Sequence, residues 1–530
     1  MKRTVLFVVD ALSEDIVSEW IGNAKLPSIQ TMLRLGGKLR PCTSIFPSIT
    51  PAATCSIATG HYPAGHGIEG ACWYDADNND SAYFGDDIKL AMQEGLHEYL
   101  VDFGDRMNYE RLQVPLVYEH FHQHGTESAC INYMWFRGPH VHSRSTPLTL
   151  RLVAGGLVTD VRGPKFLKLG DFVHSLPDDA KDVAGMQTGL LNRYGFNDET
   201  TAAVMMSLAK SDSLPAFSLA YFPLNDDVGH SDGLHHAASV CVEAFDEFLG
   251  EFVEAIGGWE LVGSEYSFLI VGDHSQTEWI DKTPRQVELD KVFEDFKRAD
   301  TAAGFVDDDE LLIGPNMRAA AVYLSKHCKR SLDEIAQLAI EHDGIDQAIH
   351  RQRDEHDGNA WTIRTKDRGR LTFYRANESD ADSPEVVRDR YGNFWKVRGD
   401  LAALDLTRGP DGELIDGNYP NPLERIEGAF PSGSSPVWLT AQPDSEFVIV
   451  ESSSHGAGSH GSLNLADSKA ALLTSRDINT DQLPAPESPR IVDVMDLCLA
   501  SLGAKRIETK AKDPMFTPDG ADSAVELATE

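Results

Sequence analysis

The sequence predicts an α/β fold with a central, mostly parallel sheet and a smaller inserted α+β subdomain. Short apolar, β-branched segments alternate with helical patterns from the amino terminus, and buried parallel strands have this continuous apolar character. The pattern changes between residues 282 and 431, where an acidic segment precedes another series of strand and helix patterns. A chain of 530 residues also exceeds the usual size of one domain, so a large core with an insertion is expected.

The elements of the core follow in order along the chain. The first apolar segment, residues 4–9, is expected to be a strand, and helices are expected at 14–21 and 27–35. Further buried strands are expected at 128–132, 217–221, 267–271 and 447–450. Polar residues follow most of these strands directly. Ligands of open α/β sheets gather beyond the carboxyl ends of strands, so these positions predict the rim of a binding site.

The insertion has its own predicted elements, a strand at 318–325, a helix at 331–342 and a hairpin at 361–374. Apolar residues recur at helical spacing once more at 490–502. We therefore divide the chain into a first part of the core at 1–281, an inserted α+β subdomain at 282–431, a second part of the core at 432–503 and a polar, frayed tail at 504–530.

The charge of the chain restricts its partners. Lys and Arg number 47 against 83 Asp and Glu, a net charge of −36, which opposes nonspecific binding to nucleic acid or anionic membranes. An anionic substrate would need local positive charge, and bound divalent cations could supply it. Seven scattered cysteines without CxxC spacing are typical of reduced thiols. No apolar stretch approaches the ~20 residues of a bilayer span, and we expect a cytoplasmic protein.

Two positions near the amino terminus are candidates for metal chemistry. Asp10 ends the first apolar strand, where a buried carboxylate needs a cation or hydrogen bonds; the alternative is a helix N-cap. Thr50 precedes Pro51 and is also a good N-cap. A hydroxyl at a helix amino terminus is well placed for a nearby anion, because the free amides and the helix dipole favour negative charge.

Two later segments pair carboxylates with imidazoles. Asp226 and His230 lie four positions apart in an expected loop after the strand that ends near Phe222, and Asp273 and His274 are adjacent after the strand at 267–271. Carboxylate oxygen and imidazole nitrogen together suit zinc, with manganese also compatible. The alternative is ordinary loop polarity for each pair. Their occurrence together favours a metal site.

The segment SSSHGAGSHGSLN adds His455 and His460, both beside glycine. The residues alone require at most one of them as a metal ligand. The chain has no Walker loop and no GxSxG elbow, and its GxGxxG matches at 65–70 and 456–461 do not lie directly between an expected strand and an expected helix, so the common nucleotide and serine-hydrolase motifs offer no other explanation.

These motifs resemble the alkaline phosphatase superfamily, most closely its type I phosphodiesterase/nucleotide pyrophosphatase branch. The resemblance rests on five segments in the expected order: VVD at 8–10, FPSITPAATCSIATGHYPAGHGI at 46–68, NDDVGH at 225–230, VGDHS at 271–275 and GSHGS at 458–462. It implies an alkaline phosphatase-like three-layer sandwich around the central sheet. It also implies two divalent ions, zinc in the relatives, at one site.

The resemblance also implies roles. Asp10, Thr50, Asp273 and His274 would hold one ion, and Asp226, His230 and His460 would hold the other. His460 is preferred over His455 because its GSHGS context is closer to the last ligand of the family. Thr50 would attack phosphorus and form a covalent phosphothreonine, which water would then hydrolyse.

The chain departs from the family at two positions. Ala71 stands where the nucleotide pyrophosphatases have an asparagine that binds a phosphate oxygen, and Pro51 replaces an aromatic residue that stacks on the nucleoside. Other residues could rebuild a substrate wall, with ordinary packing as the alternative: Trp73, Tyr74, Tyr133, Trp135 and Arg137.

The resulting hypothesis is a metal-dependent hydrolase of phosphate esters, with diesters favoured and a small phosphate ester or phosphonate as the partner. A phosphonate hydrolase or phosphomonoesterase on the same site is the alternative enzyme. A catalytically silent anion-binding scaffold is the alternative outside catalysis. The sequence does not specify an oligomeric state.

Overall fold

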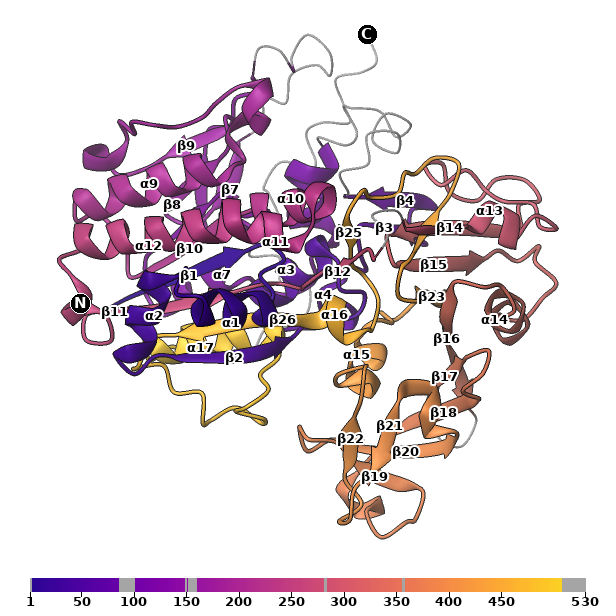
Figure 1. The fold of residues 1–530 in the computed structure, drawn as a ribbon. Helices are drawn as coiled ribbons and strands as arrows, with labels where there is room; N and C mark the ends of the chain where they lie inside the picture. Colours follow the sequence, from indigo (N-terminus) through magenta and orange to yellow (C-terminus); the bar gives the residue numbers. More distant parts are fainter. Residues whose placement is uncertain are drawn as a thin grey trace, which may run out of the picture.

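A computed structural model describes residues 2–84, 101–147, 150, 160–280, 284–354 and 358–507. Two eight-stranded sheets organise these residues. The first carries helices on both faces, and the second lies beside it, at the right of Figure 1.

The first sheet is the central sheet of the predicted fold, and it is mostly parallel. Its strand order is β2-β26-β11-β1-β10-β5-β8-β9. The five strands from β11 to β8 pair in parallel, whereas β26 and β9 pair antiparallel to their neighbours. The strands are β1 (Arg3–Val9), β2 (Lys38–Thr43), β5 (Ser128–Ile131), β8 (Phe166–Leu169), β9 (Val173–Ser175), β10 (Phe217–Phe222), β11 (Tyr266–Val271) and β26 (Lys469–Thr474).

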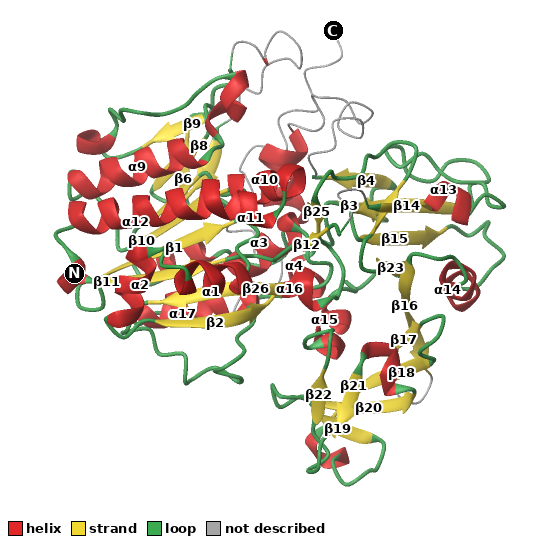
Figure 2. Cartoon of the chain, in the orientation of Figure 1, coloured by secondary structure: helices red, strands yellow, loops and turns green. Residues whose placement is uncertain are grey.

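Helices cover both faces of this sheet, which gives the three layers (Figure 2). Alternate side chains of β1 explain the arrangement, because successive residues of a strand point to opposite faces. Phe7 packs with Phe245 and Phe252 of one helical layer, while Leu6 and Val8 belong to the other apolar cluster. One layer contains α1 (Glu14–Gly22), α2 (Pro27–Arg34), α9 (Asp198–Lys210) and α12 (Glu243–Ala255), and the other contains α3 (Thr50–Thr59), α7 (Val117–Gln123) and α17 (Val494–Ser501).

The second sheet is antiparallel throughout. Its order is β14 (Leu311–Asn316), β15 (Ala319–Leu324), β23 (Val437–Ala441), β16 (Ile345–Asp354), β17 (Gly358–Arg364), β18 (Arg370–Ala376), β20 (Phe394–Gly399) and β19 (Val386–Arg388). Helix α14 (Leu332–Ile340) packs on it. The expected strand at 318–325, helix at 331–342 and hairpin at 361–374 correspond to β15, α14 and the β17–β18 pair.

Shorter elements complete the described structure. The remaining helices are α4 (Pro63–His66), η1 (Asp102–Arg111), η2 (Asp178–Ala180), η3 (Leu190–Gly195), α10 (Leu224–Asp232), α11 (Leu234–Ala237), η4 (Ala238–Val242), η5 (Trp259–Leu261), α13 (Leu289–Val292), η6 (Glu378–Asp380), η7 (Leu401–Leu404), α15 (Pro422–Gly428), α16 (Leu465–Ser468) and η8 (Ile491–Asp493). Two-stranded sheets pair β3 (Cys72–Asp75) with β4 (Asp80–Tyr83), β6 (His140–His142) with β7 (Val161–Gly163), β12 (Thr277–Glu278) with β25 (Gly458–Ser459), β13 (Arg285–Glu288) with β24 (Ser445–Val448), and β21 (Leu406–Arg408) with β22 (Leu414–Asp416).

Three expectations differ from the structure. The strand expected at 447–450 is β24, and it pairs with β13 outside the central sheet. The NDDVGH segment, expected as a loop, lies in α10. Thr50 is the first residue of α3 and not its N-cap, which is Ile49.

The domain division at residues 282, 431 and 503 stays a prediction. Residues 281–283 and 508–530 lie outside the described residues, so neither the first boundary nor most of the predicted tail can be compared. Strand β23 of the second sheet follows residue 431. The first tail residues are packed, since the Ile507 amide donates to His120 Nδ1 at 3.0 Å. Of the helices in the described part of the chain, none combines the length and apolar character needed to cross a membrane.

Candidate metal centre

Three neighbouring parallel strands bring the candidate ligands to one edge of the central sheet. Asp10 directly follows β1, α10 follows β10, and Asp273 follows β11 after Gly272. Because these strands are parallel and adjacent, their carboxyl ends meet. A side chain at Gly272 would place its Cβ 2.4 Å from the Leu12 carbonyl oxygen, so only glycine permits this close approach of the two loops.

Thr50 and His460 reach the same edge from other segments. Thr50 begins α3, and its Oγ1 lies 3.0 Å from His274 Nε2. His460 follows β25, and its Nε2 lies 3.5 Å from Asp226 Oδ1. The structure therefore brings together residues that are up to 450 positions apart in the sequence.

The side chains form two overlapping groups whose ligand atoms lie within 4.8 Å of one another. One group contains Asp226, His230 and His460, and the other contains Asp10, Asp226 and His274. Asp273 adjoins the second group, with its Oδ2 at 3.3 Å from His274 Nε2. The expected division assigned Asp226 to one ion; in the structure, its carboxylate is common to both groups.

Backbone carbonyls orient the three imidazoles. The Nδ1 atoms of His230, His274 and His460 face the carbonyl oxygens of Gly458, Ser275 and Ser48 at 2.8, 3.1 and 2.7 Å. A carbonyl can only accept, so each Nδ1 carries the proton and each Nε2 presents a lone pair. The Thr50 hydroxyl then donates to His274 Nε2. Imidazoles fixed in this way are typical of metal ligands.

Two carboxylates share a similar arrangement, in which one oxygen is held and the other is left over. Asp10 Oδ2 accepts a short hydrogen bond from the Tyr221 hydroxyl, and Asp273 Oδ1 accepts from the amides of Ala11 and His274 at 3.1 and 3.0 Å. Asp10 Oδ1, Asp273 Oδ2 and His460 Nε2 are buried without a hydrogen bond to any described residue. Burying such atoms is costly, and cations in the two groups would satisfy all three.

Burial and mutual repulsion perturb these groups strongly. Burial, followed by the charges of Asp273 and Asp226, raises the pKa of Asp10 well above its ordinary value. Burial also raises the pKa of Asp226, but the neighbouring His230 and His460 outweigh it and lower that pKa. Burial lowers the pKa of His460 well below its usual range. His460 is therefore neutral near pH 7, as a metal ligand must be.

Several residues that sequence reasoning missed support the candidate ligands. Tyr221 lies within β10 and Gln276 just after the GDHS segment, and each donates a hydrogen bond to a ligand carboxylate. His455 is not in either ligand group. Its Nδ1 lies 2.6 Å from the buried Glu446 carboxylate, and its ring packs in a tilted arrangement against His230 at a centroid distance of 4.0 Å.

Several of the residues considered for a substrate wall are buried and bonded to other parts of the protein. Tyr133 and Trp135 are fully buried and donate to the Thr54 carbonyl and hydroxyl at 2.6 and 2.9 Å, which holds them against α3. Arg137 pairs with Glu119 at 3.0 Å and also donates to three backbone carbonyls. These contacts occupy the polar groups that a substrate would need.

The loop around Ala71 is held by the second sheet. Asn316, at the end of β14, accepts hydrogen bonds from the amides of Ala71 and Cys72 at 2.7 and 3.2 Å. Its own amide donates to the Cys72 carbonyl at 2.8 Å. The position where the relatives carry an asparagine is thus fixed through its backbone.

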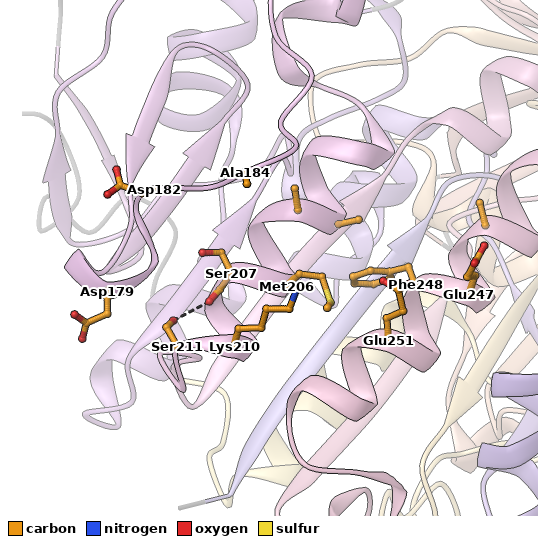
Figure 3. A pocket seen from close by; sticks show the side chains of 13 residues that line it. Asp179, Asp182, Ala184, Met206, Ser207, Lys210, Ser211, Glu247, Phe248 and Glu251 are labelled. Atoms are coloured by element: carbon orange, nitrogen blue, oxygen red, sulfur yellow. Dashed lines mark hydrogen bonds between the residues drawn. The ribbon is translucent and has the colours of Figure 1, made fainter.

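A surface groove lies apart from the metal ligands. It has a volume of about 810 Å³ and lies between α9 and α12, with Met206 and Phe248 along it and Asp182, Glu247 and Lys210 at its margins (Figure 3). None of the candidate metal ligands lines it. The residues that line this groove, of mixed charge, do not form a cluster of nucleophilic or metal-binding side chains.

One family model matches most of the chain. A sequence model of the family "Type I phosphodiesterase / nucleotide pyrophosphatase" matches residues 4–403. No curated protein matches the chain.

Solved structures share the fold at low sequence identity. An inactive variant of murine ectonucleotide pyrophosphatase / phosphodiesterase 5 in complex with AMP has a TM-score of 0.54 and 13% identity, covering 97% of this chain and 98% of that chain. The human protein of the same name has a TM-score of 0.53 and 15% identity, with coverage of 97% of each chain. Phosphonoacetate hydrolase from Sinorhizobium meliloti 1021 in complex with phosphonoformate has a TM-score of 0.52 and 14% identity, covering 94% of this chain and 96% of that chain.

Proposed function

The chain belongs to the type I phosphodiesterase / nucleotide pyrophosphatase family and is an enzyme of that hydrolase class; from this premise we propose that it cleaves phosphate esters with Thr50 as the nucleophile and two divalent ions as cofactors. The observation that carries the proposal is the convergence of buried, unsatisfied ligand atoms from Asp10, Asp273 and His460 next to the Thr50 hydroxyl.

The ligand atoms fit two divalent cations. Asp226, His230 and His460 would hold one ion, and Asp10, Asp273, His274 and Thr50 would hold the other, with Asp226 close to both. The mixture of carboxylates and imidazoles favours zinc and is compatible with manganese. When bound, such ions neutralise charge on the phosphoryl group and favour deprotonation of hydroxyls beside them.

Thr50 is positioned to attack. It is the first residue of α3, where free amides and the helix dipole favour the anionic phosphoryl group. Its oxygen forms a bond to phosphorus, and the leaving-group oxygen departs with the electron pair of the broken bond. With a diester, the resulting phosphothreonine keeps the second ester group, and its hydrolysis by water releases a phosphomonoester and restores the hydroxyl. The inactive murine protein carries a threonine-to-alanine substitution, which supports a threonine in this role.

Substitution of Thr50 tests the mechanism. We expect Thr50→Ala to lower turnover by about 10⁴-fold or more, since the covalent step is lost. Thr59→Ala is the matched control, because Thr59 lies in the same helix and its hydroxyl bonds to backbone groups, donating to the Cys55 carbonyl at 2.8 Å and accepting from the His61 amide at 3.3 Å. Full turnover by Thr50→Ala would refute the nucleophile, whatever the metal content.

The substrate is the second question. We propose a phosphodiester, with a phosphonate as the alternative, because Pro51 replaces the aromatic residue that stacks on a nucleoside in the relatives. Structural neighbours bind AMP, a phosphomonoester of the kind that diester cleavage releases, in one case and phosphonoformate in another, which supports both classes. Turnover of bis-nitrophenyl phosphate, nitrophenyl phosphate and phosphonoacetate separates a diesterase, a monoesterase and a phosphonate hydrolase. A metal-free protein that turns over none of them would be the silent scaffold.

The remaining proposals concern partners and location. All seven cysteines are free thiols and six are buried, which supports a reducing, cytoplasmic location. The net charge of −36 opposes nucleic acid and anionic membranes as partners. A small anionic substrate could still bind at the metal site, where the cations supply local positive charge. Imaging of the tagged full-length chain in its own cell would decide the location.

A further inference from the structure

Gln276 connects the loops that carry the two groups of candidate ligands. It lies three residues after Asp273 and is 2% exposed. Its side-chain Nε2 makes a short hydrogen bond to Asp226 Oδ1 and donates to the Asp226 backbone carbonyl at 3.0 Å. The segment after β11 is therefore tied to the first turn of α10.

Two glycines leave the space that this side chain fills. A Cβ at Gly229, in α10, would lie 2.4 Å from Gln276 Oε1, and a Cβ at Gly458, in β25, would lie 3.1 Å from the same atom. Oε1 itself is buried and makes no hydrogen bond to a described residue. The glutamine thus occupies a slot between the helix and the strand, where its amide has little room to turn.

Asp226 needs such support more than the other carboxylates do. Asp10 is held by the Tyr221 hydroxyl and Asp273 by two backbone amides, both parts of the central sheet or its loops. For Asp226 Oδ1, the donor is Gln276. A neutral amide fixes the carboxylate without adding a positive charge, so the full charge of Asp226 remains available to cations.

We propose that Gln276 is a positioning residue that sets the direction of the Asp226 carboxylate and so keeps the two ion sites in register. The inference rests on the proposed two-metal function, because Asp226 belongs to both ligand groups. If the amide is lost, the carboxylate rotates, and the geometry of both groups changes together.

Metal affinity of Gln276→Met tests the proposal. Methionine keeps the length of the side chain and loses the donor. We expect zinc to bind about 10- to 100-fold more weakly, the usual effect of removing a partner of a metal ligand. The measurement is competition between the protein and a chromogenic zinc chelator, with ions per chain counted on the purified holoprotein.

Gln347→Met is the matched control. Gln347 is a fully buried glutamine of the second sheet, with hydrogen bonds to Ala403 and Thr440 at 3.3 and 3.0 Å. This variant should lose stability and keep wild-type zinc affinity. Equal affinity of Gln276→Met and wild type would overturn the proposal, and so would an equal loss in both methionine variants.

Gly229→Ala provides a second route if Gln276→Met folds poorly. Alanine suits a helix better than glycine does, so the helix itself should tolerate the change, while the new Cβ displaces Gln276 Oε1. We expect weaker zinc binding than in wild type, and no further loss when Gly229→Ala is added to Gln276→Met. Additive losses would contradict a shared mechanism. A wild-type protein that binds no divalent ion would instead refute the proposed function itself.

Discussion

At the residue scale, the candidate site shows how three carboxylates can share a small buried space. Each of Asp10, Asp226 and Asp273 has one oxygen engaged by a neutral donor, a tyrosine hydroxyl, a glutamine amide or backbone amides. None of these donors carries charge, so the carboxylates together retain a strong preference for cations. The preference of this site for cations therefore depends on the neutral hydrogen-bond donors as well as on the carboxylates.

Glu69 gives a prediction at this scale. Burial raises its pKa from 4.5 to about 7, against the opposing effect of hydrogen bonds from Ser434 and Tyr323. The folded pKa is above the unfolded one, so its contribution is full below pH 4.5 and is lost as pH rises through 7. That rise corresponds to about 3 kcal/mol. We expect the free energy of unfolding to fall less between pH 5 and pH 8 in Glu69→Gln than in wild type.

The measurement is urea unfolding at several pH values. Glutamine can still accept from Ser434, whose Oγ lies 2.9 Å from Glu69 Oε2, so the hydrogen bond is preserved. Glu110→Gln is the control, since Glu110 is exposed and lines, together with Glu69, a cavity of about 430 Å³. Parallel pH profiles for wild type and Glu69→Gln would show that the buried carboxyl does not titrate in this range.

The ligand types were visible in the sequence, but their supports were not. Asp273 and His274 follow an apolar strand, and that pattern predicts a site. Tyr221 reads as one more buried strand residue, and Gln276 as an ordinary loop residue. Their roles depend on hydrogen bonds to residues 211 and 50 positions away, which local patterns do not encode.

At the scale of elements, α10 is a helix whose sequence has the composition of a loop. Its sequence, LNDDVGHSD, has Asn, Asp and Gly where loops have them. The first-turn Asp226 and Asp227 suit a helix amino terminus, and Gly229 is required by the Gln276 side chain. The helical spacing puts Asp226 and His230 on one face, one turn apart, which a loop would not ensure.

A buried ion pair links the second sheet to the ligand loops. Arg318, in the turn before β15, forms a fully buried pair with Asp467, and its amide donates to the His460 carbonyl at 2.9 Å. Asp467 also accepts from Thr277 and from the Ser462 amide at 2.6 and 2.8 Å. The loops on either side of the ligands therefore meet at this one carboxylate.

Asp467→Ala should destabilise the protein strongly. It leaves the Arg318 charge buried without its partner, an effect of about 3–5 kcal/mol. Chemical unfolding measures the loss. Glu288→Ala is the control, because its pair with Lys291 has side chains 48% and 70% exposed and should contribute less than about 1 kcal/mol. Similar losses in the two variants would argue against a special role for the buried pair.

At the scale of the whole molecule, the order of apolar segments predicted the central sheet, because buried parallel strands have a simple pattern. β24 was assigned to that sheet in error, since an apolar segment does not reveal its pairing partner. The antiparallel position of β26 between β2 and β11 depends on long-range pairing and was equally invisible.

Metal removal gives a prediction for the entire chain. We expect chelation by EDTA to lower the thermal unfolding midpoint and added zinc to restore it, since an ion at 100 times its Kd stabilises by about 2.7 kcal/mol. Sodium chloride at matched ionic strength is the control, because it screens the net charge of −36 without specific binding. Equal effects of salt and zinc would mean that only general repulsion is relieved.

The position of β26 also determines when the central sheet can be completed during synthesis of the chain. Strand β2 (Lys38–Thr43) joins the central sheet only through β26 (Lys469–Thr474), and His460 lies just before that strand. During synthesis of the chain, β2 lacks its neighbour β26, and one group of candidate ligands lacks His460. Both become available only after more than 400 further residues have left the ribosome. Under the proposed two-metal function, metal loading would follow the synthesis of nearly the whole chain, and a chain truncated before His460 would lack one of the proposed ligands.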